Sequence, residues 1–299
     1  MSEGFTHKSG YIGIVGKPNA GKSTLLNYLV GQKLAITSPK PQTTRHRTLG
    51  ILTTDDYQMV FIDTPGIHTP KDQLHQFMKQ EVDTTLDDVD VVLFLADPTS
   101  PPDEDDLLAL EYLKKQKKPA VFAFNKSDMK STPNTELYGD ILDRFPVIHI
   151  SALRGTGCDE LLDKILNLLP AGPKYFDEET VTDRSERFIV SELIREQIYN
   201  LFEKEIPYSV AVVTEEVKDR GDGMTYIQAT IHVEKDSQKG IIIGSGGRML
   251  KKIGQQARAD IEEMLGTKVY LELWVKVKKN WRRDNSLLHQ LGMDIIKKK

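Results

Sequence analysis

An eight-residue motif near the N-terminus constrains the fold of this chain more than any other feature. Residues 16–23 read GKPNAGKS and lie between the apolar run 11–15 and the helix-like run 24–29. Glycines at both ends of the bend let consecutive backbone N–H groups point toward one spot at the N-terminus of the following helix. Such a loop binds phosphate groups, and a strand-loop-helix unit that carries it indicates an α/β domain.

The residues of this motif have individual expected roles. Lys22 is expected to reach the β- and γ-phosphates of a bound nucleotide, and Ser23 is expected to bind Mg²⁺. An ordinary glycine turn between strand and helix is the alternative, and the motif alone does not identify the nucleotide. The predicted nucleotide contacts here are Gly16, Lys17, Pro18, Asn19, Ala20, Gly21, Lys22, Ser23 and Thr24.

The composition is that of a globular chain with room for two domains. Of the 299 residues, 39% are hydrophobic and 28% are charged, which are ordinary values. Cys158 is the single cysteine, which excludes an internal disulfide and a cysteine-rich zinc site and favours a reducing compartment. The N-terminus lacks the apolar segment of a signal peptide, and no apolar run approaches the roughly 20 residues of a spanning helix. We therefore expect a cytoplasmic protein.

Short apolar runs alternate with longer amphipathic ones through about residue 170. The apolar runs are nearly continuous in Val, Ile, Leu and Phe, as in strands buried on both faces of a mainly parallel sheet. This alternation predicts a three-layer α/β domain with a six-stranded sheet over 1–172. Strands are expected over 12–15, 59–62, 91–96, 120–124 and 147–150, with an antiparallel edge strand over 48–54, and helices over 23–30, 74–89, 103–116, 136–145 and 159–169.

A second domain is predicted after the run LLPAGP at 168–173, because two prolines and a glycine cannot continue a helix. The acidic segment 173–183 is expected to be an exposed linker. The remainder, 184–299, is expected to form a smaller α+β domain in the order helix, strand, strand, helix, helix, strand. Its elements are expected over 185–205, 209–217, 224–233, 238–243, 248–265 and 269–277.

Three short motifs at the ends of predicted strands identify the nucleotide. In DTPG at 63–66, the carboxylate can hold Mg²⁺ through water and the Gly66 amide can contact a γ-phosphate. In NKSD at 125–128, Asp128 can accept from N1–H and the exocyclic amine of guanine, a donor pair that adenine lacks. The run SAL at 151–153 can present a backbone N–H to guanine O6. Because these loops meet at one edge of the sheet, a guanine-nucleotide site is predicted with contacts from Asp63, Thr64, Pro65, Gly66, Asn125, Lys126, Asp128, Ser151, Ala152 and Leu153.

The segment 38–47, SPKPQTTRHR, has no apolar periodicity and is expected to order when a ligand binds. Thr43 or Thr44 can complete the Mg²⁺ shell beside Ser23 and Asp63, and we favour Thr44. The predicted catalytic set is Lys22, Thr44, Asp63 and Gly66.

Hydrolysis is expected to be slow. In Ras-type enzymes a glutamine directly after the glycine of D-x-x-G orients the attacking water. This chain has Ile67 there, which cannot form hydrogen bonds through its side chain. His68 and His46 are expected to be solvent-exposed loop residues rather than catalytic groups.

The C-terminal third of the chain is basic. Between 235 and 283, twelve Lys and Arg stand against five Asp and Glu, a local charge of +7 in a chain of net charge −4, so the remainder carries −11. This asymmetry indicates a polyanionic partner, with a solvated lysine-rich surface as the alternative. The turn GSGG at 244–247 lies between two predicted helices, where small residues would let an RNA backbone approach. The predicted RNA contacts are Lys239, Ile243, Gly244, Ser245, Gly246, Gly247, Arg248, Lys251 and Lys252, with Arg282 and Arg283 as weaker candidates.

Taken together, the motifs resemble one known family over nearly the whole chain. GKPNAGKS, DTPG, NKSD, QTTR at 42–45 and VEKDSQKGIIIG at 233–244 look like the Era-like family of translation-factor-class GTPases. That resemblance implies a Ras-like P-loop GTPase domain followed by a type II KH domain. It also implies a monomer that acts in assembly of the small ribosomal subunit and binds 16S rRNA near its 3′ end. It makes Asn19 a candidate K⁺ ligand, the alternative being a loop asparagine that bonds its own backbone.

Two other functions are compatible with parts of the sequence. A membrane-linked signalling GTPase is suggested by the basic segments 276–283 and 297–299, which would contact an anionic membrane surface. An RNA chaperone with an inactive nucleotide domain is the other alternative. The complete set Lys22, Ser23, Asp63 and Asp128 argues against it.

Overall fold

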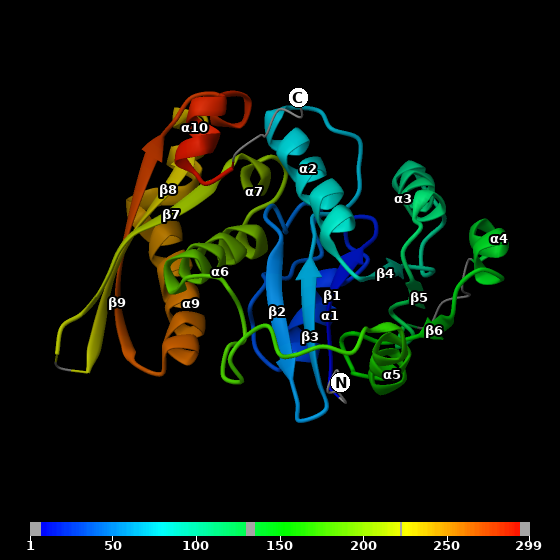
Figure 1. The fold of residues 1–299 in the computed structure, drawn as a ribbon. Coiled ribbons are helices and arrows are strands. Elements are labelled where there is room, and N and C mark those ends of the chain that lie inside the picture. The colour runs from blue at the N-terminus through cyan, green and yellow to red at the C-terminus, as the bar shows by residue number, and fades with distance from the viewer. Residues whose placement is uncertain (1–6, 130–134, 222, 294–299) are drawn as a thin grey trace. The chain divides into compact units, whose positions relative to one another are not determined.

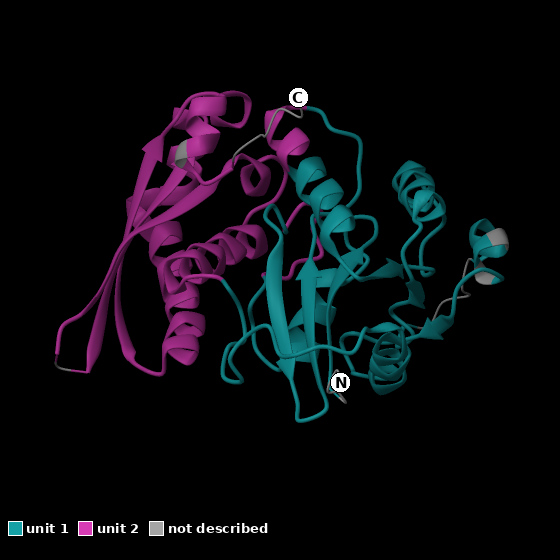
Figure 2. Cartoon of the chain, viewed as in Figure 1, with its two compact units in different colours: residues 1–35, 44–71, 78–183 teal, residues 36–43, 72–77, 184–299 magenta. Residues whose placement is uncertain are grey.

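A computed structural model describes residues 7–129, 135–221 and 223–293. The chain forms two compact units (Figure 2). Unit 1 comprises residues 1–35, 44–71 and 78–183, and unit 2 comprises residues 36–43, 72–77 and 184–299. This division differs from the predicted domain boundary at residue 172. Residues 173–183 group with unit 1, and the short segments 36–43 and 72–77 group with unit 2. The basic segment 297–299 lies outside the described residues.

Unit 1 is built on a six-stranded sheet in the order β2-β3-β1-β4-β5-β6 (Figure 1). Strand β2 is antiparallel to β3, and the other neighbouring pairs are parallel. The central strands are buried on both faces, which explains their continuous apolar sequences. The strands are β1 (Lys8–Val15), β2 (Thr48–Thr53), β3 (Tyr57–Asp63), β4 (Val91–Ala96), β5 (Ala120–Phe124) and β6 (Val147–His149).

Helices cover both faces of this sheet and create two hydrophobic cores. One core contains residues of α1 and α5, and the other contains residues of α2, α3 and the η1–α4 turn. The helices are α1 (Lys22–Val30), α2 (Gln73–Asp88), α3 (Glu104–Lys115), η1 (Glu136–Tyr138), α4 (Gly139–Leu142) and α5 (Cys158–Leu168). The three-layer α/β prediction is confirmed.

The predicted helix over 136–145 is wrong in its length and regularity. The chain forms a 3₁₀ turn and then a single α-helical turn that ends at Leu142. Phe145 precedes Pro146, and a residue before proline is forced away from the helical region. The helix therefore cannot continue into β6.

The predicted exposed linker, 173–183, is hydrogen-bonded to the edge of unit 1. The side chain of Gln58 on β3 accepts from the amides of Tyr175 (2.7 Å) and Phe176 (3.0 Å) and donates to the Phe176 carbonyl (2.9 Å). The Ile51 amide of β2 donates to the Val181 carbonyl (2.9 Å). These bonds extend unit 1 to residue 183.

Unit 2 contains a three-stranded sheet in the order β7-β8-β9. Strand β7 (Ala211–Asp219) is antiparallel to β8 (Met224–Val233), which is parallel to β9 (Lys268–Val277). Helices α6 and α9 pack on this sheet, and alternate residues of β8, such as Ile227 and Ile231, are fully buried. The helices are α6 (Glu186–Leu201), α7 (Ile206–Ser209), α8 (Asp236–Ile243), η2 (Ser245–Gly247), α9 (Arg248–Leu265), η3 (Trp281–Arg283) and α10 (Asn285–Gln290).

The first helix of unit 2 is shorter than predicted. It ends at Leu201 rather than at 205, because Phe202 is extended and Lys204 has a positive φ of 55°. Pro207 then stands in the first turn of α7, where its missing N–H costs nothing. The helix α10 was not predicted, since its six residues give too short a pattern to recognise. None of the helices within the described ranges combines the length and the apolar character needed to cross a membrane.

We expect unit 2 to lose stability in mild acid through His232. Burial lowers the pKa of this histidine to about 4, and the nearby Lys278 and Lys276 add to the effect. The folded unit binds the proton less readily than the unfolded chain, so the free energy of unfolding falls by about 2–3 kcal/mol from pH 6.5 to pH 4. Both tryptophans, Trp274 and Trp281, lie in unit 2, so tryptophan fluorescence in urea titrations measures it. The change His232→Gln should flatten the pH dependence, and an unchanged slope would contradict this assignment.

Candidate functional site

The phosphate loop of unit 1 is held tightly between its neighbours. Gly16 has a φ of +153°, and a Cβ there would lie 2.2 Å from the Leu95 carbonyl oxygen of β4. Gly21 has a φ of +96°, and a Cβ there would lie 2.2 Å from Nδ2 of Asn125. Only glycine fits at either position. The loop sequence is therefore dictated by backbone conformation and by close packing together.

Asn125 connects the phosphate loop to the loop after β6. Its Nδ2 donates to the Ala20 carbonyl (2.8 Å), and its Oδ1 accepts from the Ala152 amide (2.9 Å). The side chain is buried, so these bonds are not weakened by competition with water. Three motifs that are far apart in the sequence are thereby fixed to one another.

The residues predicted to recognise guanine lie at the same edge of the sheet. Ser151 Oγ donates to Asp128 Oδ1 (2.6 Å), which orients the carboxylate predicted to accept from guanine. The Lys126 ammonium forms an ion pair with Asp97 at the end of β4. Burial alone would raise the pKa of Asp97, but the hydrogen bonds from Lys126 and Thr99 lower it overall. Leu153 is exposed, so its side chain is the least constrained of the predicted contacts.

Ser23, Thr44 and Asp63 converge at the predicted Mg²⁺ position. Asp63 Oδ2 accepts from Ser23 Oγ (2.7 Å) and Thr44 Oγ1 (3.2 Å), and the two hydroxyl oxygens lie 2.8 Å apart. Thr43 contributes no hydroxyl contact to this cluster, and its carbonyl instead accepts from Arg195 of α6 within unit 2. The structure therefore favours Thr44 over Thr43 at this position.

This cluster fits a small divalent cation. Asp63 is fully buried, and its Oδ1 has no hydrogen-bond partner. Burial raises the pKa of Asp63 to about 6, against the lowering effect of Lys22, Ser23 and Thr44. A buried carboxylate with an unused oxygen, beside two hydroxyls, is a set of hard oxygen donors that suits Mg²⁺.

Lys22 is placed to bind the charge of a phosphate group. Its ammonium donates to the carbonyls of Gly16 (3.1 Å) and Lys17 (2.9 Å). Burial lowers its pKa to about 8, opposed by Asp63. Phosphate oxygens are stronger acceptors for an ammonium than backbone carbonyls, so a bound nucleotide can draw Lys22 toward it. When bound, Mg²⁺ would neutralise the negative charge that develops on the phosphates, and Lys22 and the loop amides would stabilise the same charge.

Ile67 and His68 occupy the loop in which a Ras-type glutamine would lie. The Ile67 side chain is buried in the core, and its amide donates to the Gly16 carbonyl (3.0 Å). His68 is half-buried, with Nδ1 2.7 Å from the Gly66 carbonyl oxygen. The prediction that His68 is a solvent-exposed residue is therefore wrong, because the ring folds back onto its own loop. His46 is likewise half-buried.

The change Asp63→Asn is expected to raise the Mg²⁺ concentration needed for half-maximal GTP hydrolysis at least about tenfold, because one carboxylate charge is lost from the cation site. A Mg²⁺ titration of hydrolysis measures it. The matched control is Asp55→Asn, an exposed acid at the β2–β3 turn. An unchanged Mg²⁺ midpoint in Asp63→Asn would contradict the assignment.

The predicted RNA turn of unit 2 forms a glycine-rich bend between α8 and α9. Gly244, Gly246 and Gly247 all have positive φ, of 70°, 60° and 79°. A Cβ at Gly246 or Gly247 would meet no atom within 4 Å, so both face open space. Arg248 donates through Nε to the Ser245 carbonyl (3.2 Å), and Lys251 and Lys252 are exposed on the next turn.

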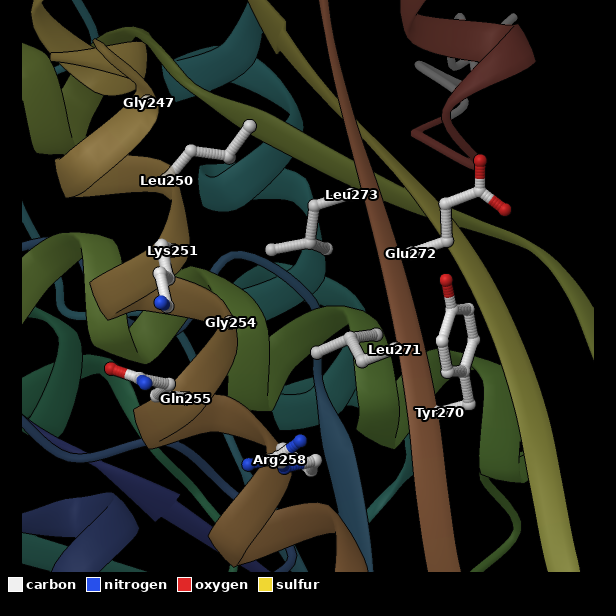
Figure 3. A pocket seen from close by; sticks show the side chains of 10 residues that line it. All are labelled: Gly247, Leu250, Lys251, Gly254, Gln255, Arg258, Tyr270, Leu271, Glu272 and Leu273. Atoms are coloured by element: carbon white, nitrogen blue, oxygen red, sulfur yellow. The ribbon is translucent and has the colours of Figure 1, made fainter. Parts of the chain in front are cut away.

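A groove of about 470 Å³ continues from this turn between α9 and β9 (Figure 3). Leu271 and Leu273 project from β9 toward α9, whereas Tyr270 and Glu272 project to the other side of the strand. Gln255 and Arg258 follow Lys251 at spacings of four and seven, which places them on the same face of α9. The lining residues that were not predicted are Leu250, Gly254, Gln255, Arg258, Tyr270, Leu271, Glu272 and Leu273.

One of the weaker RNA candidates already pairs with a carboxylate. The Arg282 guanidinium forms an ion pair with the largely buried Asp72, which belongs to the same unit. Burial alone would raise the pKa of Asp72, but hydrogen bonds from His75 and the charge of Arg282 hold it well below its usual range. Arg282 therefore has a carboxylate partner within unit 2, and its role in RNA binding stays a prediction.

Both halves of the chain match known protein families. Residues 11–126 match the family described as a 50S ribosome-binding GTPase, and residues 205–282 match the KH domain family. GTPase Era of Carboxydothermus hydrogenoformans is 49% identical to this chain, covering 96% of this chain and 98% of its own length. The chain belongs to the Era family of GTPases. The prediction of an Era-like GTPase domain followed by a KH domain is confirmed.

Two solved Era structures extend the comparison. An Aquifex aeolicus Era variant bound to GDP and AlF₄⁻ matches with a TM-score of 0.90 at 39% identity, over 96% of this chain and 100% of that chain. A second Era structure, in complex with MgGDPNP and nucleotides 1506–1542 of 16S ribosomal RNA, matches with a TM-score of 0.91 at 39% identity, over 97% and 100%. An Era-family chain is a GTP-hydrolysing enzyme, and Mg²⁺ accompanies the nucleotide in that second relative.

Proposed function

We propose that this Era-family chain couples GTP binding and slow hydrolysis to RNA binding during assembly of the small ribosomal subunit. The RNA would be 16S rRNA near its 3′ end, held by the KH unit along the glycine turn and the α9–β9 groove. The RNA bound by the second Era relative supports this assignment. Slow hydrolysis follows from Ile67, whose buried side chain replaces the water-orienting glutamine.

The observation that carries the proposal is the surface chemistry around the turn 244–247. Two glycines face open space, three basic side chains follow on α9, and a groove with an apolar floor lies alongside. A KH turn needs this combination, since the RNA backbone must approach closely while its bases rest in the groove. A merely solvated lysine-rich face would not need the glycines or the groove.

The segment 36–43 offers a physical route from the nucleotide to the RNA-binding unit. Within unit 2, Arg195 donates to the Thr43 carbonyl and Tyr199 donates to the Gln42 carbonyl (2.9 Å), both from α6. The next residue, Thr44, contacts Ser23 and Asp63 at the cation site. A movement of Thr44 would therefore displace Thr43 and Gln42, which are hydrogen-bonded to α6. We infer that the affinity for RNA depends on which nucleotide is bound.

The direct test is the affinity of the purified chain for a fluorescent RNA that carries the 3′-terminal segment of 16S rRNA. Anisotropy should show binding at least about tenfold tighter with a non-hydrolysable GTP analogue than with GDP, a difference of about 1.4 kcal/mol. A scrambled RNA of equal length controls for charge. Equal affinity in both nucleotide states would refute the coupling, and equal affinity for both RNAs would refute the RNA assignment.

We also propose Asn19 as a K⁺ ligand that assists hydrolysis. Asn19 lies in the phosphate loop with a positive φ of 62°, inside the stretch predicted to surround the phosphates. Hydrolysis rates in KCl and NaCl at equal ionic strength test this idea. A faster rate in KCl that disappears in Asn19→Ala is expected, and equal rates in both salts would reject it. The monomeric state, a cytoplasmic location and a peripheral membrane contact stay predictions.

A further inference from the structure

Lys17, in the phosphate loop, extends its side chain to the start of α3. Its ammonium lies 2.6 Å from Oδ2 of Asp106 and 3.4 Å from Oδ2 of Asp103. The Lys17 and Asp106 side chains are only 8% and 4% exposed. Burial alone would lower the pKa of Lys17, but Asp106 and Asp103 raise it overall. The lysine therefore stays charged, and its ammonium pairs with two carboxylates at the start of α3.

Asp106 is a rigid anchor, because its carboxylate is fixed by other bonds. Its Oδ2 accepts from the Asp103 amide (3.0 Å), and its own amide donates to Asp103 Oδ1 (3.0 Å), so the two form the capping box that starts α3. Its Oδ1 accepts from the hydroxyl of the buried Tyr138 (3.1 Å). A residue attached to this carboxylate is attached to the start of a helix.

The attachment reaches Lys22 through the backbone of Lys17. The Lys17 carbonyl accepts from the Lys22 ammonium (2.9 Å) and from the Ala20 amide (3.4 Å). Fixing the side chain of Lys17 therefore limits the movement of the carbonyl that positions Lys22. Loss of the ion pair would also leave a buried charge without its partner, which is strongly unfavourable.

The segment that leads into α3 also contacts the predicted guanine-binding motif at 125–128. Residues 97–106 join β4 to the first turn of α3, and Asp97 at their start pairs with Lys126 of the NKSD motif. Asp106 at their end pairs with Lys17. One segment thus restrains the phosphate-binding and the guanine-binding parts of the site.

We propose that Lys17 is a positioning residue, whose ion pair with Asp106 holds the phosphate loop in its binding conformation and slows the release of guanine nucleotide. This role rests on the nucleotide-binding activity of the family and does not depend on the RNA function. Displacement of the start of α3 would therefore also speed the release of guanine nucleotide.

The test is the release rate of a fluorescent GDP analogue from the full chain. Lys17→Met and Asp106→Asn should each release it at least about tenfold faster. The double variant should resemble the single variants rather than multiply their effects, because the two side chains act as one unit. Lys17→Arg should stay within about threefold of the parent. The matched control is Lys115→Met at the far end of α3, where the side chain is 77% exposed and its ammonium lies 3.7 Å from Oε2 of Glu111.

Thermal unfolding of the nucleotide-free variants separates positioning from stability. A purely structural ion pair would lower the unfolding temperature and leave the release rate and kcat/KM unchanged, and that result would overturn the proposal. Release rates that multiply in the double variant would also overturn it.

If Lys17→Met does not fold, Tyr138→Phe offers a second test, because it removes one hydrogen bond to Asp106 and keeps the ion pair. About two- to fivefold faster release is then expected, and an unchanged rate contradicts the proposal. Failure of the parent chain to bind GDP would instead reject its nucleotide function.

Discussion

Replacing Asp128 with asparagine is expected to weaken GTP binding by roughly two to three orders of magnitude and to strengthen binding of xanthosine triphosphate. The carboxylate is predicted to accept from two donors of guanine, whereas an amide would place its own N–H against one of them. Xanthine carries a carbonyl where guanine has the exocyclic amine, so it can accept from that N–H. Competition between the two triphosphates for a fluorescent GDP analogue measures the change in preference.

The control for this change is Asp143→Asn, an exposed aspartate of the same unit. It alters the net charge equally and should leave the preference for GTP intact. The bond from Ser151 to Asp128 survives in Asp128→Asn through the amide oxygen, so the loop should keep its conformation. An Asp128→Asn variant that still prefers GTP would show that another group recognises guanine.

Replacing Gly246 and Gly247 together with aspartate is expected to weaken RNA binding at least about hundredfold. Both positions have positive φ, which aspartate tolerates at modest cost, and both added side chains enter open space. The fold should therefore survive, while two negative charges and two side chains occupy the path of the RNA backbone. RNA anisotropy at fixed salt measures the loss, and GTP hydrolysis without RNA should remain at the parent rate.

A matched control uses Gly221 and Gly266. These glycines also have positive φ, of 77° and 66°, and a Cβ at either would meet nothing within 4 Å. The double change Gly221→Asp and Gly266→Asp alters the net charge equally and also places aspartate at positive φ, but it lies outside the turn 244–247. It should keep RNA affinity within about threefold. Equal losses in both double variants would mean that net charge, and not the turn, controls binding.

The layered fold and most of the nucleotide site could be predicted because their signals are local. Buried parallel strands are continuous in apolar residues, and each motif follows the end of such a strand. Parallel strands then bring the motif loops to one edge without further information. Thr44, which was favoured over Thr43, has its hydroxyl beside Ser23 and Asp63 in the structure.

The remainder depended on contacts between residues far apart in the sequence. Lys17 reads as one more phosphate-loop residue until Asp106, 89 positions later, is seen to hold it. Gln58 gives no sign that it binds residues of the supposed linker. Arg282 looks like a phosphate ligand until Asp72 is found beside it. In each case the sequence shows a polar side chain, and only the structure shows the distant residue to which it bonds.

Sequencing of crosslinked RNA shows whether this chain binds small-subunit ribosomal RNA and whether that binding depends on GTP. The parent chain and the double variant with Gly246→Asp and Gly247→Asp should each be loaded with a GTP analogue or with GDP. Each loaded protein should then be crosslinked to RNA in a cell extract, and the bound RNA should be sequenced. We predict enrichment of the 3′ end of 16S rRNA in the parent with the GTP analogue, and its loss in the variant. Absence of that RNA from the parent in both nucleotide states would mean that the chain does not bind small-subunit ribosomal RNA.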